Sequence, residues 1–244
     1  MILSEELCIG CGECVVVCPG GAISVGADVA CIDRDLCFEC CVCHRWDGCP
    51  THAFEPETSL PWPRSLRRLF SDPLALFEGT SVSGRGTEEM KTDDVSDRFA
   101  GDVLGISVDV GRPNVGTRFD EVERICAVLA EAGLRFAPDN PVTELMDDVR
   151  RGTLPEEIRD ERVLSAVIEG LTDLWGLPPV LSALEKVAGN VDTVFSVGLI
   201  ARTPGPDGIE RLKSIARGAG GCPRPSAKIN LGLGKKSHGS SDCP

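Results

Sequence analysis

The sequence has few aromatic residues and no long hydrophobic run. Aromatic residues make up 5% of the 244 positions and tyrosine is absent, so a core must be built mainly from Val, Leu, Ile and Ala. The longest apolar stretch, Val191 to Ala201, is interrupted by Asp192, Thr193 and Ser196 and is too short for a membrane span of about 20 residues. Residues Met1 to Glu6 lack the basic start of a secretory signal. We therefore expect a soluble, cytoplasmic protein with no membrane span.

Basic residues are also scarce, above all near the start of the chain. Residues 1–57 contain ten Asp or Glu but only two basic residues, Arg34 and Arg45, which gives −8 of the total formal charge of −13. Such a surface repels nucleic-acid phosphates, so nucleic acid is excluded as an expected partner. The acidity instead predicts a redox partner protein with a basic docking face. The alternative is an acidic surface that only aids solubility.

Cysteine is the residue in excess. The chain has 13 cysteines, and ten of them lie between Cys8 and Cys49. In an exported protein this density would indicate disulfides. Here the start of the chain and the regular spacing of the cysteines favour bound metal instead.

Two cysteine runs repeat nearly the same spacing. They read Cys8-x2-Cys11-x2-Cys14-x3-Cys18-Pro19 and Cys37-x2-Cys40-x2-Cys43-x5-Cys49-Pro50. Three cysteines at successive two-residue gaps place their sulfurs around one tight loop, whereas a cubane cluster needs a fourth thiolate from elsewhere in the chain. The repeat continues past the cysteines, because Ala22-Ile23 matches Ala53-Phe54.

These runs resemble the bacterial two-cluster ferredoxins and the ferredoxin-like domains of larger oxidoreductases, over about residues 3–56. The resemblance implies two [4Fe–4S] clusters whose ligands cross between the two runs. The ligands would be Cys8, Cys11, Cys14 and Cys49 for the first cluster, and Cys37, Cys40, Cys43 and Cys18 for the second. Paired Cys-x2-Cys motifs can also bind zinc, but eight cysteines in this arrangement fit two cubane clusters better.

The second run departs from the family pattern. Five residues separate Cys43 from Cys49, and Cys41 stands where the first run has Gly12. We interpret Cys41 and the additional Cys31 as small side chains and not as ligands. Cys126 is interpreted as a core residue on the apolar face of its helix and Cys222 as not binding metal, and we assign no functional role to Cys126, Cys222 or Cys243. His44 and His52 are interpreted as surface residues, with proton coupling as the alternative. Because the two halves differ, we expect two distinct reduction potentials.

The composition divides the chain into three segments. Residues 1–57 form the predicted two-cluster domain, residues 58–100 an extended connector or arm, and residues 101–244 a second domain. A flexible linker is one interpretation of the connector. However, it contains many large apolar residues, which predicts that it packs on the second domain or on a partner subunit. These residues are Trp62, Leu66, Leu69, Phe70, Leu74, Leu76 and Phe77.

The second domain shows strand and helix patterns in the order β-α-β-β-α-β. We expect strands at 103–110, 134–137, 163–171 and 191–201, and helices at 118–132 and 177–188. The predicted fold is therefore α+β, with a ferredoxin-like (ACT-like) sandwich acting as a docking or regulatory domain. A helix at 209–216 and a strand at 228–231 would be appended. The loops at 111–118 and 232–236 resemble anion-binding loops only weakly, and plain connecting loops are the alternative.

The residues indicate no catalytic machinery of their own. We find no Ser/His/Asp set, zinc triad or dinucleotide fingerprint. We therefore expect a non-catalytic subunit that relays single electrons to or from a larger oxidoreductase, in an anaerobic or microaerobic setting. A redox- or ligand-sensing regulatory protein and a self-contained reductase are the alternatives. A homo-oligomer formed through the C-terminal domain is a further expectation.

Overall fold

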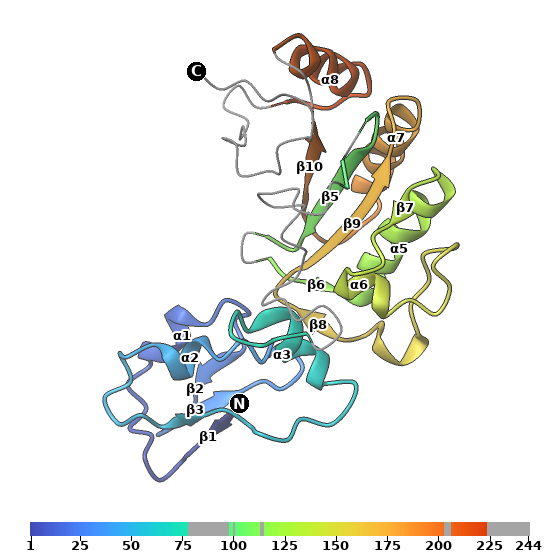
Figure 1. The fold of residues 1–244 in the computed structure, drawn as a ribbon. Coiled ribbons are helices and arrows are strands. Elements are labelled where there is room, and N and C mark those ends of the chain that lie inside the picture. Colours follow the sequence, from blue (N-terminus) through green and yellow to red (C-terminus); the bar gives the residue numbers. More distant parts are fainter. Residues whose placement is uncertain (78–97, 100, 113–114, 203–205, 224–244) are drawn as a thin grey trace, which may run out of the picture.

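The computed structural model describes residues 1–77, 98–99, 101–112, 115–202 and 206–223. Figure 1 shows an N-terminal part of short strands and helices, and a C-terminal part built around a longer sheet. The predicted strand at 228–231, the loop at 232–236 and Cys243 lie outside the described residues. Among the described residues, no helix is long and apolar enough to cross a membrane.

The N-terminal part consists of two similar halves. Strand β1 (Ile2–Leu3) pairs with β4 (Phe54–Glu55), and β2 (Ile23–Val25) pairs with β3 (Ala30–Ile32), both antiparallel. A short helix contains the third cysteine of each triplet, α1 (Glu13–Val17) with Cys14 in the first half and α2 (Val42–Arg45) with Cys43 in the second. The elements are short because most of this chain forms loops around the cysteines.

The hydrophobic core of the N-terminal part is small. Its buried apolar side chains pack directly against the cysteines, and they are Met1, Ala22, Ile23, Ala30 and Phe54. A core of this size stabilises a domain of fewer than 60 residues only marginally, so such domains commonly depend on a disulfide or a bound metal.

The connector packs against the C-terminal part through helix α3 (Ser65–Ser71). Leu66, Phe70 and Phe77 are buried in the same core as the C-terminal sheet. The Phe70 ring contacts the rings of Phe77 and Phe119 edge-to-face, at centroid distances of 6.0 and 5.1 Å. The predicted packing of the arm is confirmed for these residues, whereas Trp62, Leu74 and Leu76 are exposed.

Four antiparallel strands form the C-terminal sheet, in the order β10-β5-β9-β7. The strands are β5 (Leu104–Val110), β7 (Arg135–Phe136), β9 (Ala166–Thr172) and β10 (Phe195–Ala201). Helix α5 (Phe119–Glu131) joins β5 to β7, and α7 (Leu177–Ala188) joins β9 to β10. The order of strands and helices predicted from the sequence is thus present in the structure.

Both helices cover the same face of this sheet (Figure 1). Alternate residues of β5, such as Ile106 and Val108, point to that face, and the register places Ile168 opposite Val108. Helix α5 buries Val122, Ile125, Cys126 and Leu129 there, at the spacing of one helical face. Helix α8 (Pro206–Gly218) adds Ala216 to the same core.

The structure differs from the expected strands at one important point. The strand predicted at 163–171 is interrupted, because β8 (Arg162–Val163) pairs with β6 (Thr117–Arg118) in a separate ribbon before β9 begins. At the break, the Leu164 N–H donates a hydrogen bond of 2.8 Å to the Ser71 hydroxyl of α3. This bond to the connector replaces a ladder bond, and sequence periodicity does not reveal it.

Two short helical elements lie in the long excursion between β7 and β8. Helix α6 (Pro141–Glu144) begins after Asn140, whose side-chain oxygen accepts hydrogen bonds from Val142 and Thr143 N–H. The 3-10 helix η1 is Glu156–Ile158, and Ile158 is fully buried. The excursion is therefore packed against the C-terminal core.

Truncation of Phe70 tests the packing of the connector. Phe70→Ala leaves a cavity between α3 and α5, and we expect a loss of about 3–5 kcal/mol in the free energy of unfolding. Thermal unfolding followed by circular dichroism measures it. The control is Leu74→Ala, whose side chain is 72% exposed, with an expected change within about 0.5 kcal/mol. Equal stabilities of the two variants would contradict this packing.

Candidate iron–sulfur site

The structure gathers four predicted ligand cysteines around a first cavity. Cys8 and Cys11 come from the loop that enters α1, Cys14 lies in α1, and Cys49 comes from the loop that enters β4. Ala30, Ala53 and Phe54 form the apolar side of this cavity. Cys18, although adjacent to this triplet in sequence, is not among the residues that line it.

The other four predicted cysteines surround a second cavity. Cys37 and Cys40 come from the loop that enters α2, Cys43 lies in α2, and Cys18 follows α1. Ala22, Ile23 and Phe38 lie beside them. Each cavity thus combines the cysteine triplet of one run with the last cysteine of the other, and Cys41 also lines the second cavity.

The donor set fits a cluster better than a single ion. All described cysteines are free, and the two cavities enclose comparable space, ≈ 310 and ≈ 360 Å³ including their solvent-open part. Among the described residues, no three His, Cys, Asp or Glu side chains are placed to hold one metal ion. A cubane cluster has four irons at its corners, and each iron takes one thiolate. It therefore requires four thiols that surround a space, whereas a single ion requires thiols that converge on one point.

The two cysteine loops share an unusual backbone. At three matching positions the residue has a positive φ, which glycine adopts freely and other residues adopt at a cost. The first half has glycine at all three, and the second half has none. The pairs, with φ values, are Gly10 (64°) and Glu39 (55°), Gly12 (80°) and Cys41 (57°), and Gly21 (60°) and His52 (49°). Both halves therefore bend in the same way around their cavities.

Backbone N–H groups point at several of the thiols. The N–H of Ala22 donates to Cys18 Sγ at 3.3 Å, and at the matching position Ala53 donates to Cys49 Sγ at 3.4 Å. Ala30 N–H donates to Cys8 Sγ at 3.3 Å. Burial opposes ionisation of Cys49, but hydrogen bonds from Ala53 and Thr51 outweigh it and lower its pKa. These donors favour sulfur in its negative, metal-binding form.

The thiols of the second cavity are more deeply buried. Burial raises the pKa of Cys40 to about 11 and that of Cys43 to about 12, and it also raises the pKa of Cys37. These groups are neutral at pH 7 when no metal is bound, so metal binding must displace their protons. In the first cavity Cys11 is exposed, which makes this site the more accessible of the two.

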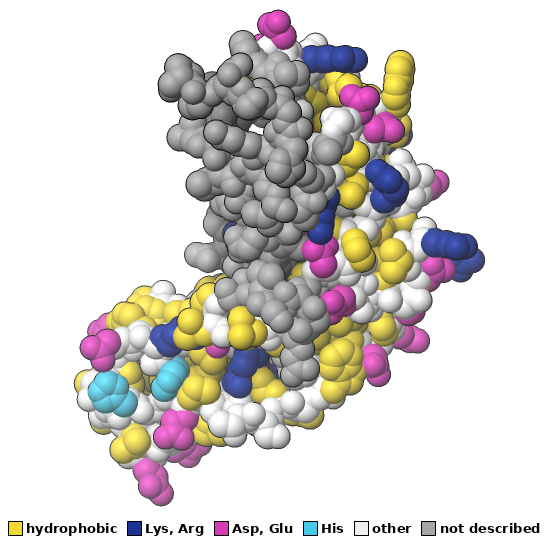
Figure 2. All heavy atoms as spheres, in the orientation of Figure 1, with side chains coloured by type: hydrophobic (Ala, Val, Ile, Leu, Met, Phe, Trp, Pro, Cys, Tyr) yellow, Lys and Arg dark blue, Asp and Glu magenta, His cyan; other side chains and the backbone are white. Residues whose placement is uncertain are grey.

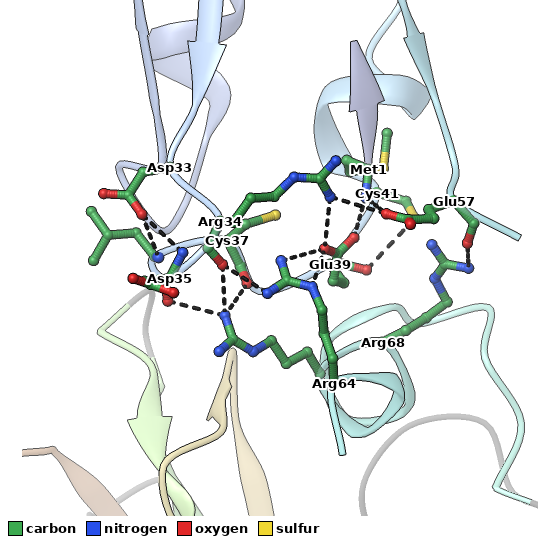
Figure 3. A network of polar contacts seen from close by, with 12 residues as sticks. Met1, Asp33, Arg34, Asp35, Cys37, Glu39, Cys41, Glu57, Arg64 and Arg68 are labelled. Carbon is green, nitrogen blue, oxygen red and sulfur yellow. Dashed lines mark hydrogen bonds and ion pairs between the residues drawn. The ribbon is translucent and has the colours of Figure 1, made fainter. Parts of the chain in front are cut away.

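A buried glutamate lies next to the second cavity. Glu39, between Cys37 and Cys40, is fully buried and accepts hydrogen bonds from the amino group of Met1 and from Arg64, at 3.1 and 2.6 Å for the two Arg64 nitrogens. Figure 3 shows Arg34 and Arg64 directed toward this carboxylate. Burial opposes its charge, but the Met1 amino group and Arg64 outweigh burial and lower the pKa of Glu39.

Sequence reasoning missed these arginines. The acidic excess of residues 1–57 is partly balanced by the connector, because Arg64 binds Glu39 and Arg68 donates to the Glu57 carbonyl at 2.6 Å. The sequence feature that could have predicted these contacts is the run Arg64-x2-Arg67-Arg68, the first dense basic group in the chain.

The other candidate residues lie apart from the cavities, with one exception. Cys31 and Cys222 are exposed, and Cys126 is fully buried in the C-terminal core, where burial raises its pKa. His44 and His52 are exposed, and His44 Nδ1 donates to the Phe54 carbonyl at 2.8 Å. Cys41 is the exception, because it is buried and lines the second cavity.

Comparison with known proteins agrees with this geometry. The 4Fe-4S binding domain family matches residues 1–24. A ferredoxin of Alicyclobacillus acidocaldarius is 41% identical over 56 residues, which cover 22% of this chain and 69% of the relative.

Two longer relatives match over a smaller share of their length. Ferredoxin Fdx2 of Sorangium cellulosum is 43% identical over 44 residues (18% of this chain, 44% of the relative), and an iron-sulfur protein of Rhodospirillum rubrum is 36% identical over 66 residues (20% and 35%). This chain therefore spans less than half of either protein. No solved structure matches the chain.

Replacement of Cys41 tests whether it is a ligand. Cys41→Gly restores the residue that the first half has at this position and removes a left-handed strain of about 1 kcal/mol. We expect iron per chain to stay at the wild-type value, measured by iron and sulfide assay after anaerobic purification. Cys40→Ala is the matched control and should lose about half of the iron, because a cubane needs its four thiolates. Iron loss in Cys41→Gly would make Cys41 a ligand.

Proposed function

The chain belongs to the ferredoxin family through its N-terminal part, and from this premise we propose that it carries two [4Fe–4S] clusters and relays single electrons to or from a larger oxidoreductase. The observation that carries the proposal is the crossed grouping of cysteines around two cavities. In this proposal Cys8, Cys11, Cys14 and Cys49 hold the first cluster, and Cys37, Cys40, Cys43 and Cys18 hold the second. The clusters supply the one-electron chemistry, and the chain holds and insulates them.

The C-terminal part supports a role beyond that of a free carrier. The strand order β10-β5-β9-β7 with two helices on one face fits the β-α-β-β-α-β sandwich of ACT-like domains, which we propose as its fold. Such a fold serves as a docking or regulatory domain in many settings and does not itself identify a ligand. We propose that it positions the cluster domain, residues 1–57, within an oxidoreductase in the cytoplasm.

The surface around the first cluster site fits a basic redox partner. Ile9 and Val16 are 62% and 82% exposed, and Ile9 lines the first cavity. The exposed acid Glu6 precedes Cys8 and Glu13 lies in α1. Asp28 lies in the turn between β2 and β3, close to this loop because a side chain at Gly10 would touch the Asp28 carbonyl. Figure 2 shows acidic side chains spread over the N-terminal part. An apolar centre with an acidic rim is complementary to a partner that has basic groups around an apolar patch.

Replacement of Cys18 tests the crossed ligation. If Cys18 belongs to the second cluster, Cys18→Ala lowers iron from about eight to about four atoms per chain, and adding Cys11→Ala removes the remaining iron. If Cys18 belonged to the first cluster, the double variant would still keep about four iron atoms. EPR of the reduced protein should then lose the broadening that two neighbouring paramagnetic clusters cause. The control is Cys31→Ala, at an exposed cysteine outside both cavities, which should keep all iron. Zinc in place of iron in the wild-type protein would reject the cluster proposal itself.

Charge reversal tests the docking surface. The acceptor is a basic cytochrome c, and the assay follows the rate at which one electron passes from the dithionite-reduced protein to the ferric haem. We expect Glu6→Lys/Glu13→Lys to lower this rate about tenfold at low salt, with the difference vanishing at high salt, because steering is screened. The control, Glu131→Lys at the end of α5, should leave the rate unchanged. Equal rates for all three proteins would contradict docking at the first cluster.

A further inference from the structure

The loop that carries Cys37 and Cys40 is bound from outside by Arg67 of helix α3. Arg67 Nη1 donates hydrogen bonds to the carbonyl oxygens of Arg34, Asp35 and Cys37, each at 3.0 Å. The side chain is buried, being 8% exposed. One guanidinium therefore fixes four consecutive residues that end at a proposed ligand of the second cluster.

Arg67 also binds the C-terminal part. Its Nε donates to Glu161 Oε2 in an ion pair, and the Glu161 side chain is only 13% exposed. The backbone carbonyl of Glu161 accepts a hydrogen bond of 3.1 Å from Phe119 N–H, at the first residue of α5. Glu161 is thus held by the helix that covers the C-terminal sheet. Because the pair is largely shielded from water, salt screens its charges less than it screens surface charges.

Phe38 forms a second connection at the same place. Its ring is 2% exposed and stands against Gly116, where a Cβ would overlap it. The guanidinium of Arg162, in β8, lies 5.7 Å from the ring centroid, within the range of a cation–π contact. Phe38 lies between Cys37 and Cys40 in the chain, so the C-terminal ribbon β6/β8 contacts the second cysteine loop directly.

We infer that Arg67 and Glu161 are positioning residues that set the reduction potential of the second cluster, so that the C-terminal domain takes part in its redox chemistry. The inference rests on the proposed function, because it requires a cluster at that site. Reduction adds one electron and no proton, taking the cluster core from 2+ to 1+. The Arg67 charge favours the reduced form, and the Glu161 charge opposes it.

The test measures the midpoint potentials of both clusters by an anaerobic titration monitored by EPR. The variants are Arg67→Met, which removes the cation, and Glu161→Gln, which removes only the anion and keeps a hydrogen-bond acceptor for Arg67. We expect the second midpoint to move to lower potential in Arg67→Met and to higher potential in Glu161→Gln. The first midpoint should stay at its wild-type value in both. The midpoint that Cys11→Ser displaces identifies the first cluster.

Shifts of opposite sign in the second midpoint potential distinguish an electrostatic role from a structural one. Loss of packing would instead shift this potential in the same direction in both variants. The control is Arg118→Gln, which breaks an exposed ion pair with Asp160 and should move neither midpoint. If Arg67→Met does not retain its clusters, Glu161→Gln decides alone: an unchanged or lowered second midpoint overturns the inference. Iron assay keeps the two proposals apart, since wild-type protein with fewer than about eight iron atoms per chain contradicts the proposed function instead.

Discussion

The crossing of Cys18 and Cys49 between the two cysteine loops is the constraint on which the N-terminal part depends. Each cavity takes the cysteine triplet of one half of the repeat and the last cysteine of the other half, and Cys41 also lines the second cavity. In the proposed ligation, neither half completes its own ligand set. One strand pair also joins the two halves, because β1 at the start of the chain pairs with β4 after Cys49. With an apolar core of a few residues, metal binding must supply much of the folding energy of these 57 or so residues.

The crossing also explains why the backbone tolerates strain in the second half. The loops must bend at matching positions to surround a cluster, and the second half does so with Glu39, Cys41 and His52 in left-handed conformation. Each costs about 1 kcal/mol or more relative to glycine. At one of these positions the reason for a residue other than glycine is visible, because the Glu39 carboxylate binds Arg64 of the connector. The first half has glycine at this position and lacks such a link, which makes the repeat unequal.

The sequence predicted the features that depend on local spacing. Cysteine spacing indicated the two triplets, and the resemblance to two-cluster ferredoxins implied the crossed fourth ligands. Alternation and helical periodicity indicated the order of the C-terminal elements, including the face of α5 that holds Cys126. It did not predict the break before β9, because the Ser71 hydroxyl that bonds Leu164 lies 93 residues earlier. Nor did it predict the pairing of Arg67 with Glu161, 94 residues apart. Sequence periodicity describes the face of an element and carries no information on which distant partner covers it.

The two proposed clusters therefore face different surroundings. The first lies behind exposed apolar and acidic residues, whereas the second lies behind Phe38 and the arginines of α3, against the C-terminal part. A carrier that exchanges electrons with one partner at a time needs a single exposed site. A relay needs one site open to a mobile partner and another fixed beside the next component. Because Glu161 binds α5 as well as Arg67, a ligand or subunit that displaced the start of α5 would change the charge next to the proposed second cluster. In the proposed relay, this would couple the C-terminal domain to electron transfer.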